Sequence, residues 1–516
     1  MRKPIVLAVL ASFAFGAVAS AQGPGPRTAT LDELLKRNVE SLMAAQKPDG
    51  HWNHDYPLGM TGLAALALKH SNDPRAATAV GKAVEYLLQQ PMEYKVYSAG
   101  TIISALYQVD PRLNAPTINK YAAALAKSVT EGEFGGMYSY GLVGAPNTRG
   151  GAGKGDNSNT QFGVLGLLFA ERAGFQVPRG VWEGLRDHYI KTQNKDGGWG
   201  YTPGQNSYHT MTLAGTISLH IAEEQIQWGA SLNHCVMAPP SRATEAGMKW
   251  VADHFTVDLS PYGLYALERL GILTGLSEFG GHYWYEEGSA KLLDAGVSTV
   301  GIGGGGDPDT AFLILFLSRG KEPIIINKLK YYGDWNNNSY DVKHLTDYIS
   351  DRMQSPMQWR IVTLQSKLDA LLKVPILYFN GIKGPAFTDD EKIKLREYVL
   401  RGGTLMVHGC RPAKESKEFD ENFRALMEEC FPESELKPLQ SGHAFFVNPR
   451  KVAKPPRIEV IQFKERIGVV YLPQGLCIDW QREGASAKAS LDVGVNMVFF
   501  LLKQAGRLTA GAKPIT

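Results

Sequence analysis

The chain has few cysteines, little net charge and few long apolar runs, and each of these shortages excludes a class of protein. Its four cysteines in 516 residues are too few for the disulfide framework of small secreted domains. Their spacing leaves open one bridge, between Cys410 and Cys430. The 54 basic and 51 acidic residues give a formal charge of only +3, so no basic field favours a nucleic-acid partner. Beyond residue 18, no apolar run approaches the roughly 20 residues that span a bilayer.

The first residues have the pattern of an export signal. Arg2 and Lys3 precede an apolar run over residues 5–18, and Ala19-Ser20-Ala21 is a small-x-small cleavage site. We therefore expect residues 1–21 to be removed and the mature protein to be secreted or periplasmic, with no stable membrane span. A retained N-terminal anchor is the alternative. Loss of Arg2 and Lys3 lowers the formal charge from +3 to +1.

A seven-residue pattern, Gln-x-x-Asp-Gly-x-Trp, occurs twice with identical spacing, over residues 46–52 and 193–199. A polar, glycine-bearing turn that ends in tryptophan and recurs far along the chain indicates a fold made from copies of one unit. Degenerate copies are predicted at residues 133–138 and 282–284. The fixed residues of the pattern are Gln46, Asp49, Gly50, Trp52, Gln193, Asp196, Gly197 and Trp199.

Residues 30–320 are predicted to form alternating helices of two kinds. The amphipathic kind, with a charged face, is expected near residues 31–46, 75–90, 113–128, 179–194, 242–254 and 285–295. The kind that is apolar on all sides is expected near residues 57–69, 97–108, 157–171, 207–222, 260–270 and 308–318. Because helices that are apolar all round are buried, the first set is expected to be outer and the second inner. Six such pairs favour a closed (α/α)6 toroid over an open solenoid.

The pattern changes near residue 320, after which short β-branched or aromatic runs alternate with amphipathic helices. The expected strands are residues 324–332, 360–364, 375–381, 404–409, 443–447, 458–463 and 467–472. Strands that alternate with helices predict an α/β domain with a largely parallel sheet over residues 321–516. Thr388-Asp389-Asp390-Glu391 is predicted to be a capping box that starts one of its helices.

The two motifs resemble the repeats of squalene-hopene cyclases and of protein prenyltransferase β-subunits. This resemblance covers about residues 30–320 and implies a toroid in which the motif glutamines and tryptophans tie neighbouring repeats together. The chemistry of those families does not come with it. The cyclase acid motif is D-x-D-D, whereas Asp307-Pro308-Asp309-Thr310 is one carboxylate short. A prenyltransferase zinc set needs Asp, Cys and His, and only Cys235 lies in this region, beside His234.

The region from about 321 to 516 resembles an uncharacterised family, domain of unknown function 4159. The residues that carry this resemblance are 334–336, 375–381, 401–405, 423–427 and 494–496. The family is remotely similar to class I glutamine-amidotransferase-like folds, which implies a flavodoxin-like arrangement. Cys410, after a predicted strand in His408-Gly409-Cys410-Arg411-Pro412, is the weak candidate for a nucleophile, with His408 or His443 as base. The sequence lacks the second glycine of a nucleophile elbow, so a strand-end cysteine without a catalytic role is favoured.

The remaining site candidates lie on the predicted rim of the toroid, where the N-terminal ends of the inner helices gather. Helix N-termini favour anions and polar ligands, but Asp and Asn there are also ordinary N-caps. His51, His54 and Asp55 suggest a metal only weakly, and we expect no metal and no cofactor. The predicted ligand-binding residues are His54, Asp55, Asn157, Asn159, Tyr208, His209, Asp307 and Asp309, with Tyr97, Asp156 and Tyr262 on the same rim.

These observations predict an exported two-domain protein whose toroid binds a glycan, an isoprenoid lipid or a peptide. The α/β domain is expected to be an accessory module that docks another envelope protein. The alternative is a carbohydrate-active or terpenoid-processing enzyme that uses the rim acids Asp55, Asp156 and Asp309. Such a glycosidase needs two carboxylates about 5–10 Å apart across a cleft.

Overall fold

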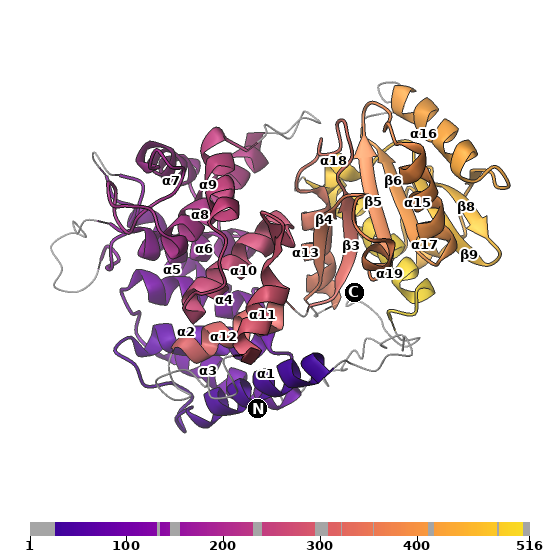
Figure 1. Ribbon diagram of the computed structural model, residues 1–516. Coiled ribbons are helices and arrows are strands. Elements are labelled where there is room, and N and C mark those ends of the chain that lie inside the picture. Colours follow the sequence, from indigo (N-terminus) through magenta and orange to yellow (C-terminus); the bar gives the residue numbers. More distant parts are fainter. Residues whose placement is uncertain are drawn as a thin grey trace, which may run out of the picture. The chain divides into compact units, whose positions relative to one another are not determined.

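The computed structural model describes residues 26–131, 135–144, 155–230, 240–294, 308–320, 322–353, 356–410, 417–481 and 485–508. The predicted export signal and Cys235 lie outside these ranges, as do residues 150–154 and 301–307. The described chain forms two compact units, a helical one that ends at Glu322 and a second one that begins at Pro323 (Figure 1).

All twelve helices predicted for the first unit are present. The amphipathic helices are α1 (Pro26–Ala44), α3 (Ala77–Gln89), α5 (Ala115–Lys127), α7 (Arg179–Thr192), α9 (Arg242–Asp253) and α11 (Trp284–Asp294). The apolar helices, called the buried helices below, are α2 (Pro57–His70), α4 (Val96–Val109), α6 (Asn157–Arg172), α8 (His209–Ala230), α10 (Pro261–Thr274) and α12 (Pro308–Arg319). A one-turn 3-10 helix at Pro74–Ala76 and a hairpin of β1 (Glu278–Phe279) and β2 (His282–Tyr283) complete the described unit.

The buried helices pack on one another in sequence order. Contacts join α2 to α4, α4 to α6, α6 to α8, α8 to α10 and α10 to α12, and α12 also contacts α2. Glycine makes the closest of these approaches possible. A Cβ on Gly100 of α4 would lie 2.3 Å from the carbonyl oxygen of Phe162 in α6, and one on Gly62 of α2 would lie 2.9 Å from the nitrogen of Ile102 in α4. The absence of side chains at these two positions therefore sets the spacing between three neighbouring helices.

The two motif copies make the same hydrogen bonds at corresponding positions. Gln46 donates through Nε2 to the carbonyl oxygens of Gly50 and Ala79, at 2.9 and 2.8 Å. Gln193 donates likewise to Gly197 and Ala243, at 2.7 and 2.8 Å. Each glutamine thus joins its own turn to the start of the next amphipathic helix.

The motif tryptophans are also equivalent. Both are buried, and their indole nitrogens donate to carbonyl oxygens ten residues back, at Leu42 and Tyr189. Their backbone nitrogens donate to the hydroxyls of Thr61 and Thr212 on the following buried helices. Tyr138, in the predicted degenerate copy, makes the same backbone bond to Thr160 on α6.

The motif glycines have left-handed backbones that only glycine adopts without strain. Gly50 has φ +104° and Gly197 has φ +91°. A Cβ at either position would also meet the backbone of the next amphipathic helix, at Lys82 or Ala246. Asp196 completes its turn by accepting hydrogen bonds from the backbone of Gly198 and from the side chains of Ser207 and Trp250. Asp49 accepts from His51 in the first copy.

The second unit is an α/β domain with a mostly parallel sheet, as the sequence predicts. Its strands are β3 (Ile324–Leu329), β4 (Gln358–Val362), β5 (Ile376–Gly381), β6 (Thr404–Gly409), β7 (Lys437–Pro438), β8 (Glu459–Phe463) and β9 (Arg466–Leu472). They lie in the order β4-β3-β5-β6-β9-β8-β7. The first five are mutually parallel, whereas β8 pairs antiparallel with both of its neighbours, β9 and β7.

Helices cover both faces of this sheet (Figure 1). The helices of the domain are α13 (Asp341–Met353), α14 (Leu368–Leu372), α15 (Asp389–Leu400), α16 (Lys417–Cys430), α17 (Ala444–Val447), α18 (Cys477–Trp480) and α19 (Ala485–Gln504). Alternate residues of β5 serve the two faces: Tyr378 packs in the core with α13 and α19, and Phe379 in the core with α15 and α16. Both faces are therefore buried, which explains the unbroken apolar runs of the central strands. The predicted capping box at Thr388 and Glu391 is confirmed.

One detail of the sequence reading is wrong. Residues 443–447, expected to be a strand, form the short helix α17, because the His443 imidazole caps it by accepting from the nitrogen of Phe445 while Phe445 and Phe446 are both buried. The bridge between Cys410 and Cys430, which the sequence left open, is not formed. Cys430 ends α16, with its sulfur 3.7 Å from the carbonyl oxygen of Lys392, whereas Cys410 follows β6 beside Cys477.

Candidate functional site

A cavity of about 350 Å³ lies in the helical unit, at the first turns of α2, α4, α6, α10 and α12. Its wall is mainly aromatic and apolar. Phe162 packs against Tyr97 and Tyr262, with ring centroids 4.9 and 6.0 Å apart, and Tyr262 packs against Phe312 at 5.7 Å. The other lining residues are His54, Tyr56, Gly59, Met60, Leu63, Ser98, Thr101, Ser158 and Pro308. None of the described lining residues carries a carboxylate.

The tyrosine hydroxyls of the cavity already have hydrogen-bond partners within the protein. The Tyr97 hydroxyl donates to Oγ of Ser158 at 2.7 Å, and the Tyr262 hydroxyl donates to Oε1 of Gln161 at 2.6 Å. Burial raises the pKa of both tyrosines well above the ordinary value. Both tyrosines are therefore neutral at physiological pH, and they offer the cavity uncharged hydrogen-bonding groups.

One carboxylate lies directly behind this wall, and the sequence did not indicate it. Glu93 precedes α4, yet it accepts from the backbone nitrogens of Leu58 at 3.4 Å and Gly59 at 3.1 Å, at the start of α2. The hydroxyl of Ser98 also donates to it. Glu93 thus places its negative charge against the positive end of the α2 dipole from a position some 35 residues away. No local capping pattern marks such a residue.

The predicted rim acids have different surroundings. Asp156 is buried and caps α6, because its Oδ1 accepts from the nitrogen of Asn159 at 2.8 Å and its Oδ2 accepts from the Asn159 amide at 2.7 Å. Asp55 is exposed, in a surface hollow with His51, Asn53, His54 and Pro57. Asp309 is half-buried in the first turn of α12, and Asp307 lies outside the described residues. Asp156 therefore acts as a helix cap, whereas the Asp55 carboxylate is open to solvent.

Most of the other predicted ligand-binding residues make contacts within the protein. Asn157 is buried and donates to the carbonyl oxygen of Gly200 at 2.8 Å. The backbone nitrogen of Tyr208 donates to the carbonyl oxygen of Trp199 at 3.3 Å, while its side chain is exposed. His54 is exposed at the mouth of the cavity, and its Nδ1 accepts from the nitrogen of Tyr56.

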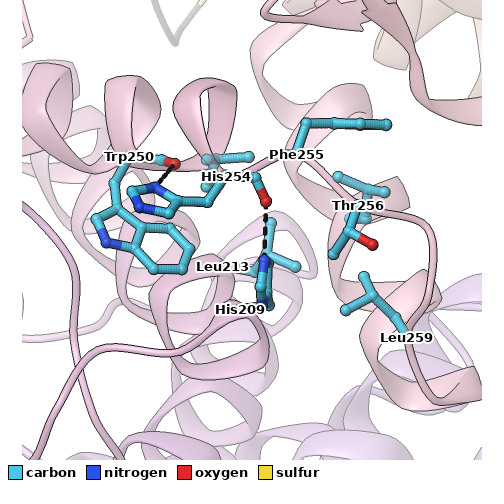
Figure 2. Close-up of a pocket in the computed structure, with 9 residues that line it drawn as sticks. His209, Leu213, Trp250, His254, Phe255, Thr256 and Leu259 are labelled. Carbon is cyan, nitrogen blue, oxygen red and sulfur yellow. Dashed lines mark hydrogen bonds between the residues drawn. The ribbon is translucent and has the colours of Figure 1, made fainter.

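His209 belongs to a different part of the surface. Its Nε2 donates to the carbonyl oxygen of His254 at 2.8 Å, and its ring lies edge-on to Trp250 (Figure 2). These residues surround a hollow of about 10 Å³, which is the size of one water molecule. Figure 2 also shows the hydrogen bond between Nδ1 of His254 and the carbonyl oxygen of Trp250. His209 is therefore a packing residue of α8 and α9.

In the α/β domain, the candidate nucleophile Cys410 is fully buried. It directly follows β6, and its backbone nitrogen donates to the carbonyl oxygen of Gly381 at the end of β5. The amide of Asn338 donates to its sulfur at 2.8 Å, and the sulfur of Cys477 lies 3.8 Å away. Gln481 holds Asn338 in place by donating to its Oδ1 at 2.7 Å.

Neither histidine proposed as a base is arranged for that task. His408 is fully buried between the rings of Tyr378 and Trp480, and both its ring nitrogens lack hydrogen-bond partners. Burial lowers the pKa of its imidazole to about 3. His443 uses Nδ1 to cap α17. The Cys–His pair of an amidotransferase is therefore not formed with either residue.

A buried charged group lies next to this cysteine. Lys328 on β3 donates to Asp341 Oδ1 at 2.7 Å and to the carbonyl oxygen of Asn338 at 2.6 Å, and both charged side chains are inaccessible to solvent. Tyr378 and Asn380 donate to the other oxygen of Asp341. The ammonium of Lys328 and the carboxylate of Asp341 therefore bond to groups within the protein and not to solvent.

Within the described ranges, no three His, Cys, Asp or Glu side chains are grouped to hold a metal ion. His51, part of the weak metal pattern, bonds instead to Asp49 at 2.6 Å and to Asn53 at 3.0 Å. In the same described part of the chain, no helix combines the length and apolarity needed to cross a membrane.

In comparisons with known proteins, a family model matches the second unit and not the helical one. Residues 325–502 match the model of a family described as a domain of unknown function, DUF4159. This match confirms the resemblance predicted for the α/β domain. No family model matches the helical region, and no curated protein matches the chain.

Proposed function

We propose that the protein is exported and that its helical region is a closed α/α toroid which binds the apolar chain of a lipid, of the isoprenoid class, in the cavity at its rim. The observation that carries this proposal is the cavity of about 350 Å³ lined by Tyr97, Phe162, Tyr262 and Phe312. Ligand pockets of a few hundred cubic ångströms with a mainly apolar wall and a few placed polar groups are typical of small-molecule sites.

Closure of the toroid is supported by the contacts of its first and last buried helices. Each buried helix contacts the next one in sequence, and α12 contacts α2. An open solenoid would leave α2 and α12 at opposite ends with an apolar side exposed. The equivalent hydrogen bonds of Gln46 and Gln193 further support repetition of one unit around the ring.

A lipid is favoured over a glycan or a peptide because of what the wall offers. Sugar hydroxyls and peptide groups must replace their bonds to water when they are buried. The hydroxyls of Tyr97 and Tyr262 already have acceptors, and the described lining residues include no Asp, Glu, Lys or Arg. An apolar chain needs no such replacement, and the aromatic rings give it a large contact area. The same lack of lining carboxylates counts against the glycosidase and cyclase alternatives.

We assign the α/β domain an accessory role, the docking of another envelope protein. Its parallel strands follow, by order of appearance, the arrangement 2-1-3-4-5, which is the flavodoxin-like order. Ligands of such folds bind beyond the carboxyl ends of the first and third strands. Here Asp334 fills that position, because its Oδ2 accepts from the backbone nitrogens of Ile382 and Lys383 at 2.6 and 3.0 Å. The Asp334 carboxylate thus already accepts the two backbone N–H groups that would otherwise bind an anion.

Thermal unfolding of the full chain tests the lipid proposal. An isoprenoid alcohol, a fatty acid, a soluble oligosaccharide and a short peptide are added separately. A ligand present at 100 times its dissociation constant stabilises the folded state by about 2.7 kcal/mol, so the isoprenoid alcohol is expected to raise the unfolding temperature of the helical unit. Stabilisation by the oligosaccharide or the peptide alone would refute the assignment to a lipid.

Two variants on one helix localise the site. Phe162 and Phe169 both lie on α6 and are each 6% exposed, but only Phe162 lines the cavity. Phe169 packs against Tyr107 instead. Phe162→Leu is expected to weaken lipid binding by about fivefold, since a lost aromatic contact costs about 1 kcal/mol. Phe169→Leu is expected to lower stability without changing binding. Equal loss of binding in both variants would show that the lipid binds elsewhere.

A further inference from the structure

Two buried thiols meet at the carboxyl ends of neighbouring parallel strands. β6 and β9 pair in parallel register, with His408 opposite Leu472. Cys410 follows the end of β6, and Cys477 begins α18 shortly after β9. Because parallel neighbours end at the same edge of the sheet, the two cysteines converge although 67 residues separate them. Their sulfur atoms are 3.8 Å apart, and both residues are completely buried.

The backbone beneath the two sulfurs is also closely packed. A Cβ on Gly475 would lie 2.0 Å from the carbonyl oxygen of Gly409 and 2.9 Å from the sulfur of Cys477. The segment that leads into α18 therefore rests directly on the end of β6. A disulfide has a sulfur–sulfur bond of about 2 Å, so the sulfurs need to approach by somewhat under 2 Å.

We propose that Cys410 and Cys477 form a structural disulfide that joins the end of β6 to the start of α18. The reaction is thiol–disulfide exchange with an external disulfide oxidant, such as glutathione disulfide or a thiol–disulfide oxidoreductase. One cysteine thiolate attacks the oxidant, which releases one thiol and leaves a mixed disulfide. The second cysteine thiolate then displaces the second thiol and forms the Cys410–Cys477 bond. The two cysteines lose two protons and two electrons, and the oxidant's disulfide becomes two thiols.

Burial determines when this bond forms. Neither thiol is reachable in the folded domain, so the oxidant reacts while the chain is folding, before α18 covers the end of β6. Once formed, the bond is equally shielded from reductants. Cys430 does not compete, because its sulfur faces the carbonyl oxygen of Lys392 between α15 and α16. The proposal does not depend on ligand binding by the helical region.

Peptide mapping of the refolded protein tests the pairing. The full chain is reduced in denaturant, refolded in a glutathione redox buffer, quenched with acid, alkylated in denaturant with N-ethylmaleimide and digested with trypsin. We expect peptides 402–414 and 467–482 to be recovered mainly as one linked species that lacks two hydrogens. Peptide 425–450, which contains Cys430, is expected to be alkylated. A parallel refolding in excess reductant should yield all three peptides alkylated.

The variants Cys410→Ala and Cys430→Ala separate this pair from the alternatives. Cys410→Ala is expected to leave peptide 467–482 alkylated, whereas Cys430→Ala should leave the linked species unchanged. The proposal is overturned if Cys410 and Cys477 are both alkylated in refolded wild-type protein whose β5 and β6 amides are protected from hydrogen exchange. It is equally overturned if either cysteine pairs mainly with Cys235 or Cys430. Because the wild-type chain alone decides between these outcomes, failure of a variant to fold does not affect the test.

Discussion

Removal of the buried charge on Lys328 should severely destabilise the α/β domain. Lys328→Met keeps the length and apolar stem of the side chain but removes the ammonium group that lies 2.7 Å from Asp341 Oδ1. Asp341 then remains buried with the donors Tyr378 and Asn380 on its other oxygen but no cation. The carbonyl oxygen of Asn338 also loses the lysine donor at 2.6 Å.

The magnitude follows from the geometry of the pair. Two unit charges 2.7 Å apart attract by about 6 kcal/mol at an effective dielectric constant of about 20. Much of this attraction offsets the cost of removing both charges from water, so the intact pair adds little net stability. Loss of one partner leaves the other charge uncompensated and costs about 3–5 kcal/mol. This is a large part of the total stability of about 5–15 kcal/mol that is usual for a folded domain.

Hydrogen–deuterium exchange in increasing urea measures the effect on the α/β domain separately from the helical unit, through peptides that cover β3, β5 and α13. Lys328→Met and Asp341→Asn should each lower the free energy of unfolding by about 3–5 kcal/mol, whereas the double variant should lose clearly less than the sum of the two. Lys330→Met is the matched control, since Lys330 lies two residues along the same segment and is exposed. A loss below about 1 kcal/mol in Lys328→Met, or strict additivity in the double variant, would refute the reasoning.

Two further predictions concern the motif glutamines and the buried histidine. Gln46→Met and Gln193→Met each remove two hydrogen bonds, so calorimetry should show that each lowers the stability of the helical unit by a similar amount, about 1–3 kcal/mol. The exposed control Gln89→Met should lower it by less than about 0.5 kcal/mol. A clear difference between the two motif variants would contradict equivalent roles. Burial lowers the pKa of His408 to about 3 in the folded state, against about 6.5 in the unfolded state. Between these two pH values the unfolded state binds one more proton than the folded state. The stability of the domain therefore falls as the pH falls from about 6.5 to about 3, by up to about 1.4 kcal/mol per pH unit. His408→Leu should flatten that dependence in urea unfolding followed by exchange of β6 peptides, and an unchanged slope between pH 6 and pH 4 would show that His408 takes up no extra proton on unfolding.

The parts of the fold that follow from local chemistry were predictable from the sequence. A helix buried on all sides needs apolar residues all round, so α4 and α6 were recognisable without any knowledge of their neighbours. The motif turn was recognisable because its glycine needs a left-handed backbone, as Gly50 and Gly197 show. Thr388 and Glu391 form their capping box within a single turn. Each of these signals is contained in a few consecutive residues, so the sequence displays it directly.

The contacts that define the candidate sites depend instead on where distant segments meet. Asp156 and Glu93 both satisfy helix N-termini, but Asp156 caps its own helix, whereas Glu93 reaches α2 from a loop that comes after α3. The local sequence pattern indicated the capping role of Asp156 but gave no sign of the contact between Glu93 and α2. The same reasoning applies to the cysteines. Cys430 is nearer to Cys410 in sequence, but a parallel sheet brings together residues that follow adjacent strands, and the strand next to β6 is β9. Pairing of cysteines in such a domain is therefore set by strand order rather than by spacing, and once the order β5-β6-β9 is known, Cys477 is the partner to expect.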